Sequence, residues 1–304
     1  MIVLRSQFSD LFLSDMLPAI DELIFMKYKD KPDPIPVIFN MKSSDRSIEQ
    51  STGIVGFGSA REIQEGASVS YEDMVQGYDK TYTHLKYGLG FKVSDESVDD
   101  GEFDFIAKAS KALARSAFEV RQVEGSNHFN RAFNSSYSGG DAKELCATDH
   151  PLIGGGTEQN ELSTSADLAV ASLRTALNDL EDMTDDNGLL LNIKPEVLLI
   201  PNELEFDAEE LLKSSLRPDT AENALNAFLS IGKMRPVVWN YLTDNDAWFM
   251  LSSKDEHDLK WYDRKPMVVL HDRDFDSDAN KVKISMRFSS GWNDFRGVFG
   301  SPGL

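Results

Sequence analysis

The sequence predicts a mixed α+β protein, and three observations support this class. Small and apolar residues recur at three- and four-residue steps over residues 100–123, which is typical of a long helix. Residues 54–93 instead alternate with the two-residue period of extended strands. After residue 235, short apolar runs separated by turn residues predict further strands. Because helix and strands are segregated along the chain, we expect the last strands to return to the layer of the long helix.

The long helix is the element around which we expect the other segments to be organised. Asp100 is its predicted N-cap, Glu102 and Asp104 favour the positive end of its dipole, and Gly125 is the predicted left-handed residue after its C-terminus. At roughly 1.5 Å per residue the helix spans about 35 Å. An ordinary amphipathic core helix is the plain interpretation. Its small and apolar stripe consists of Phe103, Ile106, Ala107, Ser110, Leu113, Ala114, Ala117 and Phe118.

Composition limits the class of protein. The chain has 304 residues, 41% of them hydrophobic, which is enough for one large domain or two modest ones. A net charge of −20 argues against free nucleic acid as a tightly bound partner. The single Cys146 excludes an intrachain disulfide framework. We find no transmembrane segment and no signal peptide, and we expect a soluble cytoplasmic product.

The first 41 residues predict an arm. A helical segment over residues 8–28 is interrupted by Pro18, and residues 31–36 are predicted to form a stiff, extended connector. The arm carries too many apolar residues for a free tail, so it packs either on its own domain or on a neighbour. These residues are Leu11, Phe12, Leu17, Ile20, Leu23, Ile24 and Phe25.

Residues 54–93 predict a long hairpin. Its tip is too polar for a core position, which favours an arm that protrudes. Gly53, Gly56 and Gly58 do not form a dinucleotide site, because the third glycine and the following helix are missing. The charged tip residues are Glu62, Glu65, Glu72 and Asp73.

The rest of the chain alternates loops with short elements. Residues 134–141 and 150–157 have loop composition, and Gly154–Gly156 lack the Lys-Ser/Thr of a phosphate loop. A helix through Leu180 is predicted to begin at Ser163, Thr164 or Ser165, before a turn at residues 185–188. A buried strand at 197–200 and a helix at 201–213 follow. Further predicted strands cover 236–242, 247–252, 259–262, 267–271 and 281–288.

Two groups of residues invite a chemical interpretation. His150 near Asp149 and Cys146 could indicate a nucleophilic site, but this spacing matches no signature, and we expect a structural role. Alternating aspartates could bind calcium, yet Ser277 and Lys283 occupy the positions that require Gly and Glu. We therefore expect a solvated acidic turn, and weak divalent binding stays open. These aspartates are Asp272, Asp274, Asp276 and Asp278.

Aromatic residues are frequent in the predicted strands of the last third. They lie beside Asp and Glu and not beside Arg and Lys, which favours a core or a subunit interface over base stacking. The residues concerned are Trp239, Tyr241, Trp248, Phe249, Trp261 and Tyr262.

Eight motifs in order resemble the major capsid proteins of tailed bacteriophages, of the Mu-like prophage major head subunit family. Each motif is weak alone, but together they cover nearly the whole chain. They are Gly56-Phe-Gly-Ser-Ala-Arg; Tyr82-Thr-His ahead of Gly88-Leu-Gly-Phe; Lys111-Ala-Leu-Ala-Arg-Ser; Ala132-Phe-Asn-Ser-Ser-Tyr; His150-Pro-Leu-Ile-Gly-Gly-Gly-Thr; Leu212-Lys-Ser-Ser-Leu-Arg-Pro-Asp-Thr-Ala; Tyr241-Leu-Thr-Asp-Asn-Asp-Ala-Trp-Phe; and Gly291-Trp-Asn-Asp-Phe-Arg-Gly-Val-Phe-Gly-Ser-Pro-Gly.

The resemblance implies the Hong Kong 97 type capsid fold. It assigns residues 1–53 to an N-terminal arm, 54–93 to the extended hairpin loop, and 94–184 to a peripheral domain with the spine helix at 100–123. An axial domain then covers 185–266, and residues 267–304 return to the peripheral domain.

The implied function is a major head protein and not an enzyme. It would self-assemble as hexamers and pentamers into the icosahedral virion shell around double-stranded DNA, without sequence-specific binding and without a membrane. Assembly is expected in the host bacterial cytoplasm, with scaffolding, portal and decoration proteins as partners.

Two features of some relatives do not carry over. The long removable scaffolding region is missing, which implies a separate scaffolding protein or a processed form, and no residue can be assigned to a covalent crosslink. We therefore predict no catalytic, cofactor-binding or metal-binding residue. An encapsulin-like protein compartment is the alternative within the fold, and a hydrolase using His150 and the aspartate run is the alternative outside it.

Overall fold

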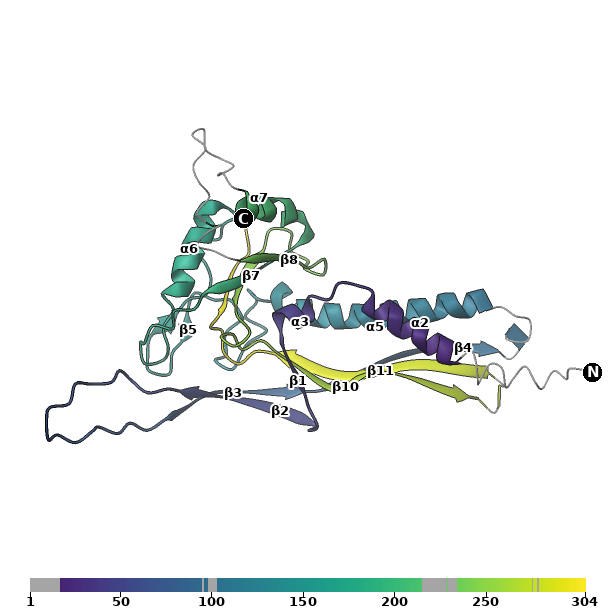
Figure 1. Ribbon diagram of the computed structural model, residues 1–304, viewed down its shortest axis with the longest axis horizontal. Helices are drawn as coiled ribbons and strands as arrows, with labels where there is room; N and C mark the ends of the chain where they lie inside the picture. Colours follow the sequence, from purple (N-terminus) through teal and green to yellow (C-terminus); the bar gives the residue numbers. More distant parts are fainter. Residues whose placement is uncertain are drawn as a thin grey trace, which may run out of the picture.

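The computed structural model describes residues 17–94, 96–97, 103–214, 228, 234–274, 276–277 and 279–304. Figure 1 shows three parts. A long sheet is covered by two helices, and a smaller sheet with its own helices lies above one end of the long sheet. A hairpin extends from that same end of the long sheet. None of the helices in these ranges has the length and apolarity to span a bilayer.

The long sheet has the strand order β1-β10-β11-β4. Strands β10 (Lys260–Arg273) and β11 (Ala279–Gly291) form an antiparallel pair, and β4 (Leu85–Ser94) adds to β11, also antiparallel. Strand β1 (Asn40–Ser43) runs parallel to β10 at the other edge. The predicted strands 259–262 and 267–271 are therefore one element, β10. The polar residues between them are accommodated in the strand by register shifts at residues 263–268.

Helix α5 (Phe103–Asn130) lies along one face of the long sheet (Figure 1). The predicted stripe is confirmed, because Ile106, Leu113 and Ala117 are buried. The predicted end at Gly125 is wrong, since the helix continues to Asn130. A Cβ at Gly125 would lie 3.0 Å from the Trp239 ring, so this glycine permits close packing inside the helix. Asp104 is in the first turn as expected, whereas the predicted cap Asp100 and the predicted dipole residue Glu102 lie outside the described residues.

The N-terminal segment packs on its own chain. Helix α2 (Leu17–Lys29) lies against α5, and Tyr28 meets Phe118 edge to face at 6.2 Å. Pro18 is tolerated because it stands in the first turn. The predicted connector at 31–36 is extended only in part, since a short helix α3 (Ile35–Ile38) begins after Pro34. The part of the predicted helix before residue 17 lies outside the described residues.

The smaller sheet has the order β12-β9-β7-β8. Its strands are β7 (Pro195–Ile200), β8 (Arg235–Val238), β9 (Trp248–Ser252) and β12 (Val298–Ser301). The predicted strand 236–242 is shorter than expected, and β12 was not predicted. Helix α6 (Val170–Glu181) and, after the 3-10 turn η2 (Asn202–Leu204), helix α7 (Glu205–Lys213) pack on this sheet.

The predicted caps of α6 at Ser163–Ser165 are wrong, because the helix begins only after Ala169. The Ser172 hydroxyl accepts the Ala169 N–H at 2.9 Å and supplies the bond expected from a cap.

The smaller sheet separates two hydrophobic cores. Val197 and Leu199 point into the core beneath α5, whereas Leu198 and Ile200 point into the core beneath α6 and α7. Strand β9 divides its side chains in the same way. Burial on both faces explains why these strands are continuous apolar runs without alternation.

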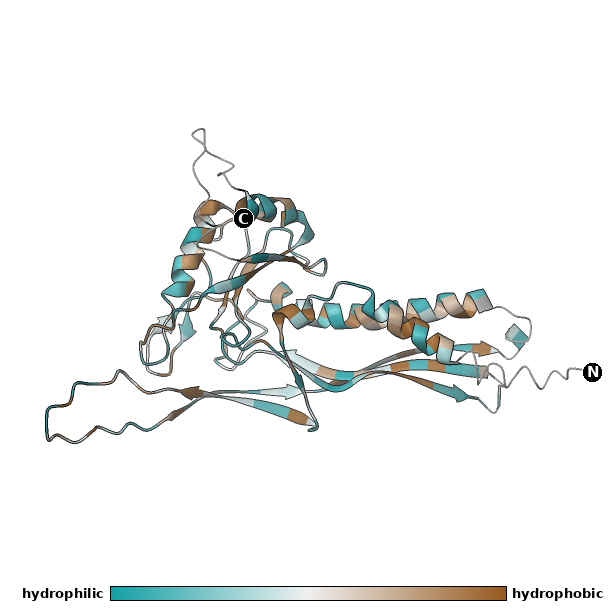
Figure 2. Cartoon of the chain, viewed as in Figure 1, coloured by the Kyte–Doolittle hydropathy of each residue, from teal (hydrophilic) through white to brown (hydrophobic). Residues whose placement is uncertain are grey.

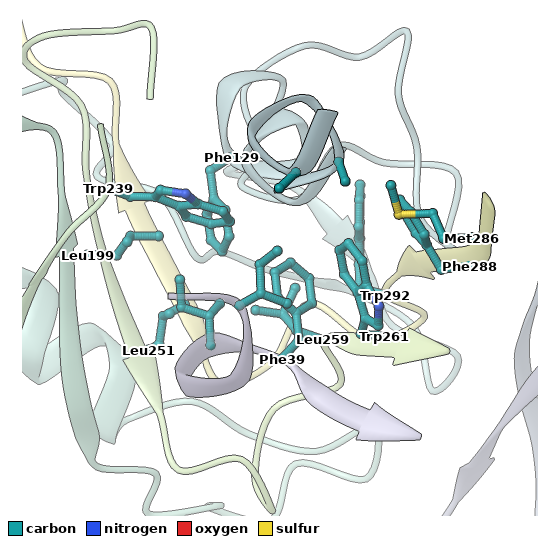
Figure 3. Packing of buried hydrophobic residues seen from close by; sticks show 14 of the residues in the cluster. Phe39, Phe129, Leu199, Trp239, Leu251, Leu259, Trp261, Met286, Phe288 and Trp292 are labelled. Carbon is teal, nitrogen blue, oxygen red and sulfur yellow. The ribbon is translucent and has the colours of Figure 1, made fainter. Parts of the chain in front are cut away.

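Aromatic rings fill the core beneath α5. Figure 3 shows Phe129 pointing from the helix to Trp239, and Phe39 lying near Trp261. Trp248, Phe249 and Tyr262 are also buried, and Tyr241 packs against the core, so the prediction that these aromatics belong to packing is confirmed.

The hairpin consists of β2 (Ile48–Val55) and β3 (Val75–Thr83). The predicted span 54–93 is therefore wrong at both ends. The alternating pattern continues past Thr83, but after His84 the chain enters β4, which pairs with β11 in the long sheet and not with β2.

Candidate functional site

The loop of the hairpin, residues 56–74, protrudes from the body (Figure 1). It mixes hydrophobic and hydrophilic segments (Figure 2), and all four predicted tip carboxylates are exposed. Tyr71 is 94% exposed, so its ring contributes little packing among the described residues. Tyr71 and the other apolar side chains that are exposed in this loop indicate a contact surface for another molecule. Others exposed here and at the adjoining strand ends are Ile54, Phe57, Ile63, Val69, Met74 and Val75.

The backbone of the hairpin is tight at its middle. Gly53 and Gly77 face each other across the strands, and a Cβ on Gly77 would lie 2.9 Å from the Gly53 carbonyl carbon. The register shifts between Thr52 and Ile54 at the same point. A side chain at residue 77 would push the strands apart, which explains the glycine pair.

The base of the hairpin is anchored on His84, which sequence reasoning missed. Its Nε2 lies 3.0 Å from the Ser44 hydroxyl and its Nδ1 lies 3.0 Å from the Ser289 hydroxyl, so it joins the hairpin to the long sheet. Desolvation, followed by the nearby Arg287, lowers the pKa of His84, which favours the neutral ring. The sequence signal that could have found this junction is a change of phase, because the aromatic residues before His84 have even numbers (Tyr78, Tyr82) and the apolar residues after it have odd numbers.

Further polar contacts fix the hairpin strands to the body. Asn293 Nδ2 donates to the Tyr78 carbonyl at 2.8 Å, and Lys260 Nζ donates to the Ser51 hydroxyl at 2.7 Å. Lys80 Nζ donates to the Ser138 carbonyl at 2.5 Å. The base is therefore held from several sides, whereas residues 57–74 of the loop make no hydrogen bond to the described residues of the body.

His150, the predicted candidate nucleophile partner, is a buried structural residue. Its Nδ1 lies 2.6 Å from Asp141 Oδ2, its Nε2 lies 2.9 Å from Asn160 Oδ1, and its ring stacks on Phe295 at 3.8 Å. Asn160 Nδ2 donates to the Leu145 and Val298 carbonyls, which fixes the amide so that Oδ1 must accept from Nε2–H. Both ring nitrogens are occupied by partners that hold loops together.

Neither of the two residues predicted near His150 bonds to its ring. Asp149 pairs with Lys143 at 2.6 Å on the surface. Cys146 is buried, and desolvation raises the pKa of its thiol well above the ordinary value, which disfavours the reactive thiolate. The carboxylate that contacts His150 belongs to Asp141, which no sequence motif had indicated. The structural interpretation of His150 is confirmed.

Of the aspartate run, Asp272 lies near the end of β10 and Asp274 and Asp276 lie in the turn before β11. Asp274 pairs with Lys281 at 2.5 Å, and the Lys281 ammonium lowers the pKa of that carboxyl. Asp278 lies outside the described residues. Within the described ranges, no group of three or more His, Cys, Asp or Glu side chains is arranged to hold a metal ion.

The fold of this chain is similar to that of subunits in solved capsid and particle structures. The capsid of bacteriophage JBD30, decorated with minor capsid protein trimers, matches with a TM-score of 0.55 at 14% identity, over 70% of this chain and 92% of that one. A second structure of the bacteriophage JBD30 capsid gives a TM-score of 0.54 at 12% identity over the same shares of both chains. A virus-like particle from Pyrococcus furiosus gives 0.53 at 10% identity, over 94% of this chain and 99% of that one. The fold is therefore that of subunits that build viral shells.

A model of the family described as phage capsid protein matches residues 77–300, which is most of the chain. The chain belongs to this family, and the resemblance to tailed-phage major capsid proteins is confirmed. No curated protein sequence matches it.

Proposed function

We propose that this chain is the major head protein of a tailed phage, and that it assembles as pentamers and hexamers into an icosahedral shell around double-stranded DNA. The observation that carries the proposal is the family match over residues 77–300 together with an anchored hairpin whose protruding loop exposes apolar side chains such as Ile63 and Tyr71. A shell subunit needs such a surface, because its contacts are satisfied only in the assembly.

The parts of the fold receive roles accordingly. Helix α5 acts as the spine helix, and α5 with the long sheet forms the peripheral domain. The smaller sheet with α6 and α7 forms the axial domain, and β2, β3 and their loop form the extended hairpin loop. On this division the axial domain includes α6 and β12, and β10 belongs to the peripheral domain, unlike the boundaries inferred from sequence.

The same proposal places the protein in the virion after assembly in the host cytoplasm. Its partners are other copies of itself, with scaffolding, portal and decoration proteins. We assign it no enzymatic activity, which is supported by the buried, fully bonded His150 and the protonated Cys146 thiol.

The alternative within the fold is a protein compartment like the encapsulins, favoured by the match to the Pyrococcus furiosus particle over nearly the whole of both chains. The test is electron microscopy and content analysis of particles purified from an infected or induced host. Nuclease-protected double-stranded DNA supports the phage head. Particles filled with protein cargo and free of DNA support the compartment, and a soluble monomer under all conditions contradicts both.

A further inference from the structure

A cavity of about 420 Å³ lies where the base of the hairpin meets the end of α5 and the end of β11. Its cations are Lys80 of β3 and Arg131, the residue that follows α5. Phe288 and Trp292, both labelled in Figure 3, contribute aromatic side chains to its wall, and the loop at residues 136–138 completes it. We call this space the junction cavity. Its volume is in the range of sites that bind small molecules.

The Arg131 guanidinium has unused hydrogen-bond donors. Its central carbon lies 4.3 Å from the centre of the Tyr137 ring. Within the described part of the chain, the guanidinium forms no ion pair and no hydrogen bond. Arginine presents five N–H donors in a planar fork that fits the oxygens of a phosphate or a carboxylate. An anion in the junction cavity would satisfy these donors.

Lys80 is a partly buried cation that forms no ion pair with the described residues. Its Nζ donates to the Ser138 carbonyl at 2.5 Å and to the Gly139 carbonyl at 3.4 Å. Burial lowers the pKa of its ammonium, and the charge of Asp141 opposes this shift. The Asp141 carboxylate is already bonded to the His150 ring at 2.6 Å. The ammonium is therefore desolvated and can accommodate a second anionic partner.

Both cations act on His128, which lines the same cavity. Burial, then Arg131 and then Lys80 lower the pKa of His128 to about 4. Its Nε2 lies 2.7 Å from the Ser290 hydroxyl. The imidazole is neutral at neutral pH, and the two cations lie close enough to it to act on one ligand. The surroundings of His128 therefore have a positive potential although the whole chain carries −20.

The acidic residue in the lining of the junction cavity, Glu124, lies away from this cationic end. Seven residues separate it from Arg131, which is about 10 Å along a helix. Burial and then Glu124 raise the pKa of Tyr87 to about 12, because the Tyr87 hydroxyl bonds to this carboxylate. Trp292 adds a further donor to the wall, since its Nε1 is buried and has no hydrogen-bond partner among the described residues.

We propose that the junction cavity binds a small phosphate monoester attached to a planar ring, such as a nucleoside monophosphate, with the phosphate at Lys80 and Arg131 and the ring at Tyr137. A phosphate monoester carries about −1.5 to −2 charges at pH 7, which matches two cations better than a single carboxylate does. The cavity is larger than a phosphate alone requires, and Tyr137 is 43% exposed, so a ligand ring can reach it. Because Lys80 belongs to the hairpin and Arg131 follows α5, the ligand would tie the hairpin to the body.

The first test is calorimetric titration of the unassembled, full-length chain with AMP, inorganic phosphate and adenosine. We expect saturable binding of AMP, weaker binding of inorganic phosphate, and binding of adenosine that is about tenfold weaker or less, because adenosine lacks the charge-assisted hydrogen bonds. AMP should also raise the thermal midpoint of the chain, since a ligand of the folded state stabilises it.

The second test separates the two parts of the site by substitution. Arg131→Gln should weaken AMP and inorganic phosphate alike, by about tenfold or more. Arg115→Gln is the matched control, because Arg115 is exposed on α5 outside the cavity, and it should change both affinities by less than about twofold. Tyr137→Ala should weaken AMP more than inorganic phosphate, which a merely structural role of the ring would not do. Circular dichroism checks that each variant folds.

Three results would overturn the proposal. The site is wrong if neither AMP nor inorganic phosphate binds saturably, or if Arg131→Gln binds AMP as tightly as the wild type does. Equal affinity for AMP and inorganic phosphate would exclude a role of the ring. A single-stranded oligonucleotide that binds more tightly than AMP and displaces it would make the cavity a nucleic-acid contact. These assays use unassembled chains, so their result does not depend on the proposed shell function.

Discussion

Shortening the hairpin loop should separate folding from assembly. The change replaces Phe57–Met74 with a short Gly-Ser linker and leaves β2 and β3 intact. Within the described residues, the loop makes one hydrogen bond to the body, from Asn187 Nδ2 to the Gly56 carbonyl at 2.8 Å, and Gly56 is retained. A roughly fivefold shorter loop lowers the closure cost by about 1.4 kcal/mol, so the free energy of unfolding should change by less than ~2 kcal/mol.

Assembly should respond very differently, because symmetry repeats each missing contact at every interface. We expect the shortened variant to melt cooperatively in thermal scans followed by circular dichroism, and to elute as free subunits in size-exclusion chromatography. A full-length control with Ile63→Ser and Tyr71→Ser keeps the backbone and removes exposed apolar contact, and should weaken particles without abolishing folding. Normal, equally stable shells from the shortened variant would refute the intersubunit role of the loop. An unfolded subunit would instead place the loop in the fold of the monomer.

Three further predictions concern buried polar groups and net charge. Asn160→Ala leaves the Leu145 and Val298 carbonyls, the Ala147 N–H and His150 Nε2 without their partner. The free energy of unfolding measured in urea should therefore fall by about 3 kcal/mol or more. The control Asn187→Ala, in an exposed turn, should lower it by less than about 0.5 kcal/mol. Burial lowers the pKa of His257 to about 4, below the 6.5 of an unfolded histidine, so the unfolded state binds the extra proton between these values. The contribution of His257 to stability should then fall by up to about 3 kcal/mol as pH is lowered from 6.5 to 4. Buried His128, whose pKa is also lowered to about 4, should add to the slope, and a slope in His257→Gln equal to that of the wild type would contradict this assignment. At −20 per chain, assembly should increase with ionic strength in sedimentation experiments, and assembly that is indifferent to salt would exclude a dominant electrostatic term.

Local periodicity predicted which faces are buried but not where elements end. The stripe of α5 from Ile106 to Phe118 was predicted because it depends on helical spacing alone. The extension of the helix through Gly125 was not predicted. A glycine is required there because the Trp239 ring, from a distant part of the chain, packs too closely for a side chain. Tertiary packing here overrides the preference of glycine for a helix terminus.

Strand pairing was predicted wrongly, although the pattern holds a signal for it. Within residues 75–94, the aromatic residues before His84 have even numbers and the apolar residues from Leu85 to Val93 have odd numbers. This change of phase falls at His84, where the two halves pair with different sheets. The pairing depends on Ser44 and Ser289, which lie far from His84 in the sequence.

The contacts of His150 could be predicted only in kind. Its structural role followed from the lack of a catalytic signature, whereas its partners Asp141 and Asn160 are brought together by loop geometry that spacing does not encode.

The most direct test of the central claim is a reconstruction of purified particles by electron microscopy at a resolution that traces individual chains. We expect closed shells of five- and six-membered rings, in which the hairpin loop of each copy, residues 56–74, extends from its own anchored strands and contacts a neighbouring copy. Particles in which the hairpin folds back on its own chain, or preparations that never form closed shells, would contradict it.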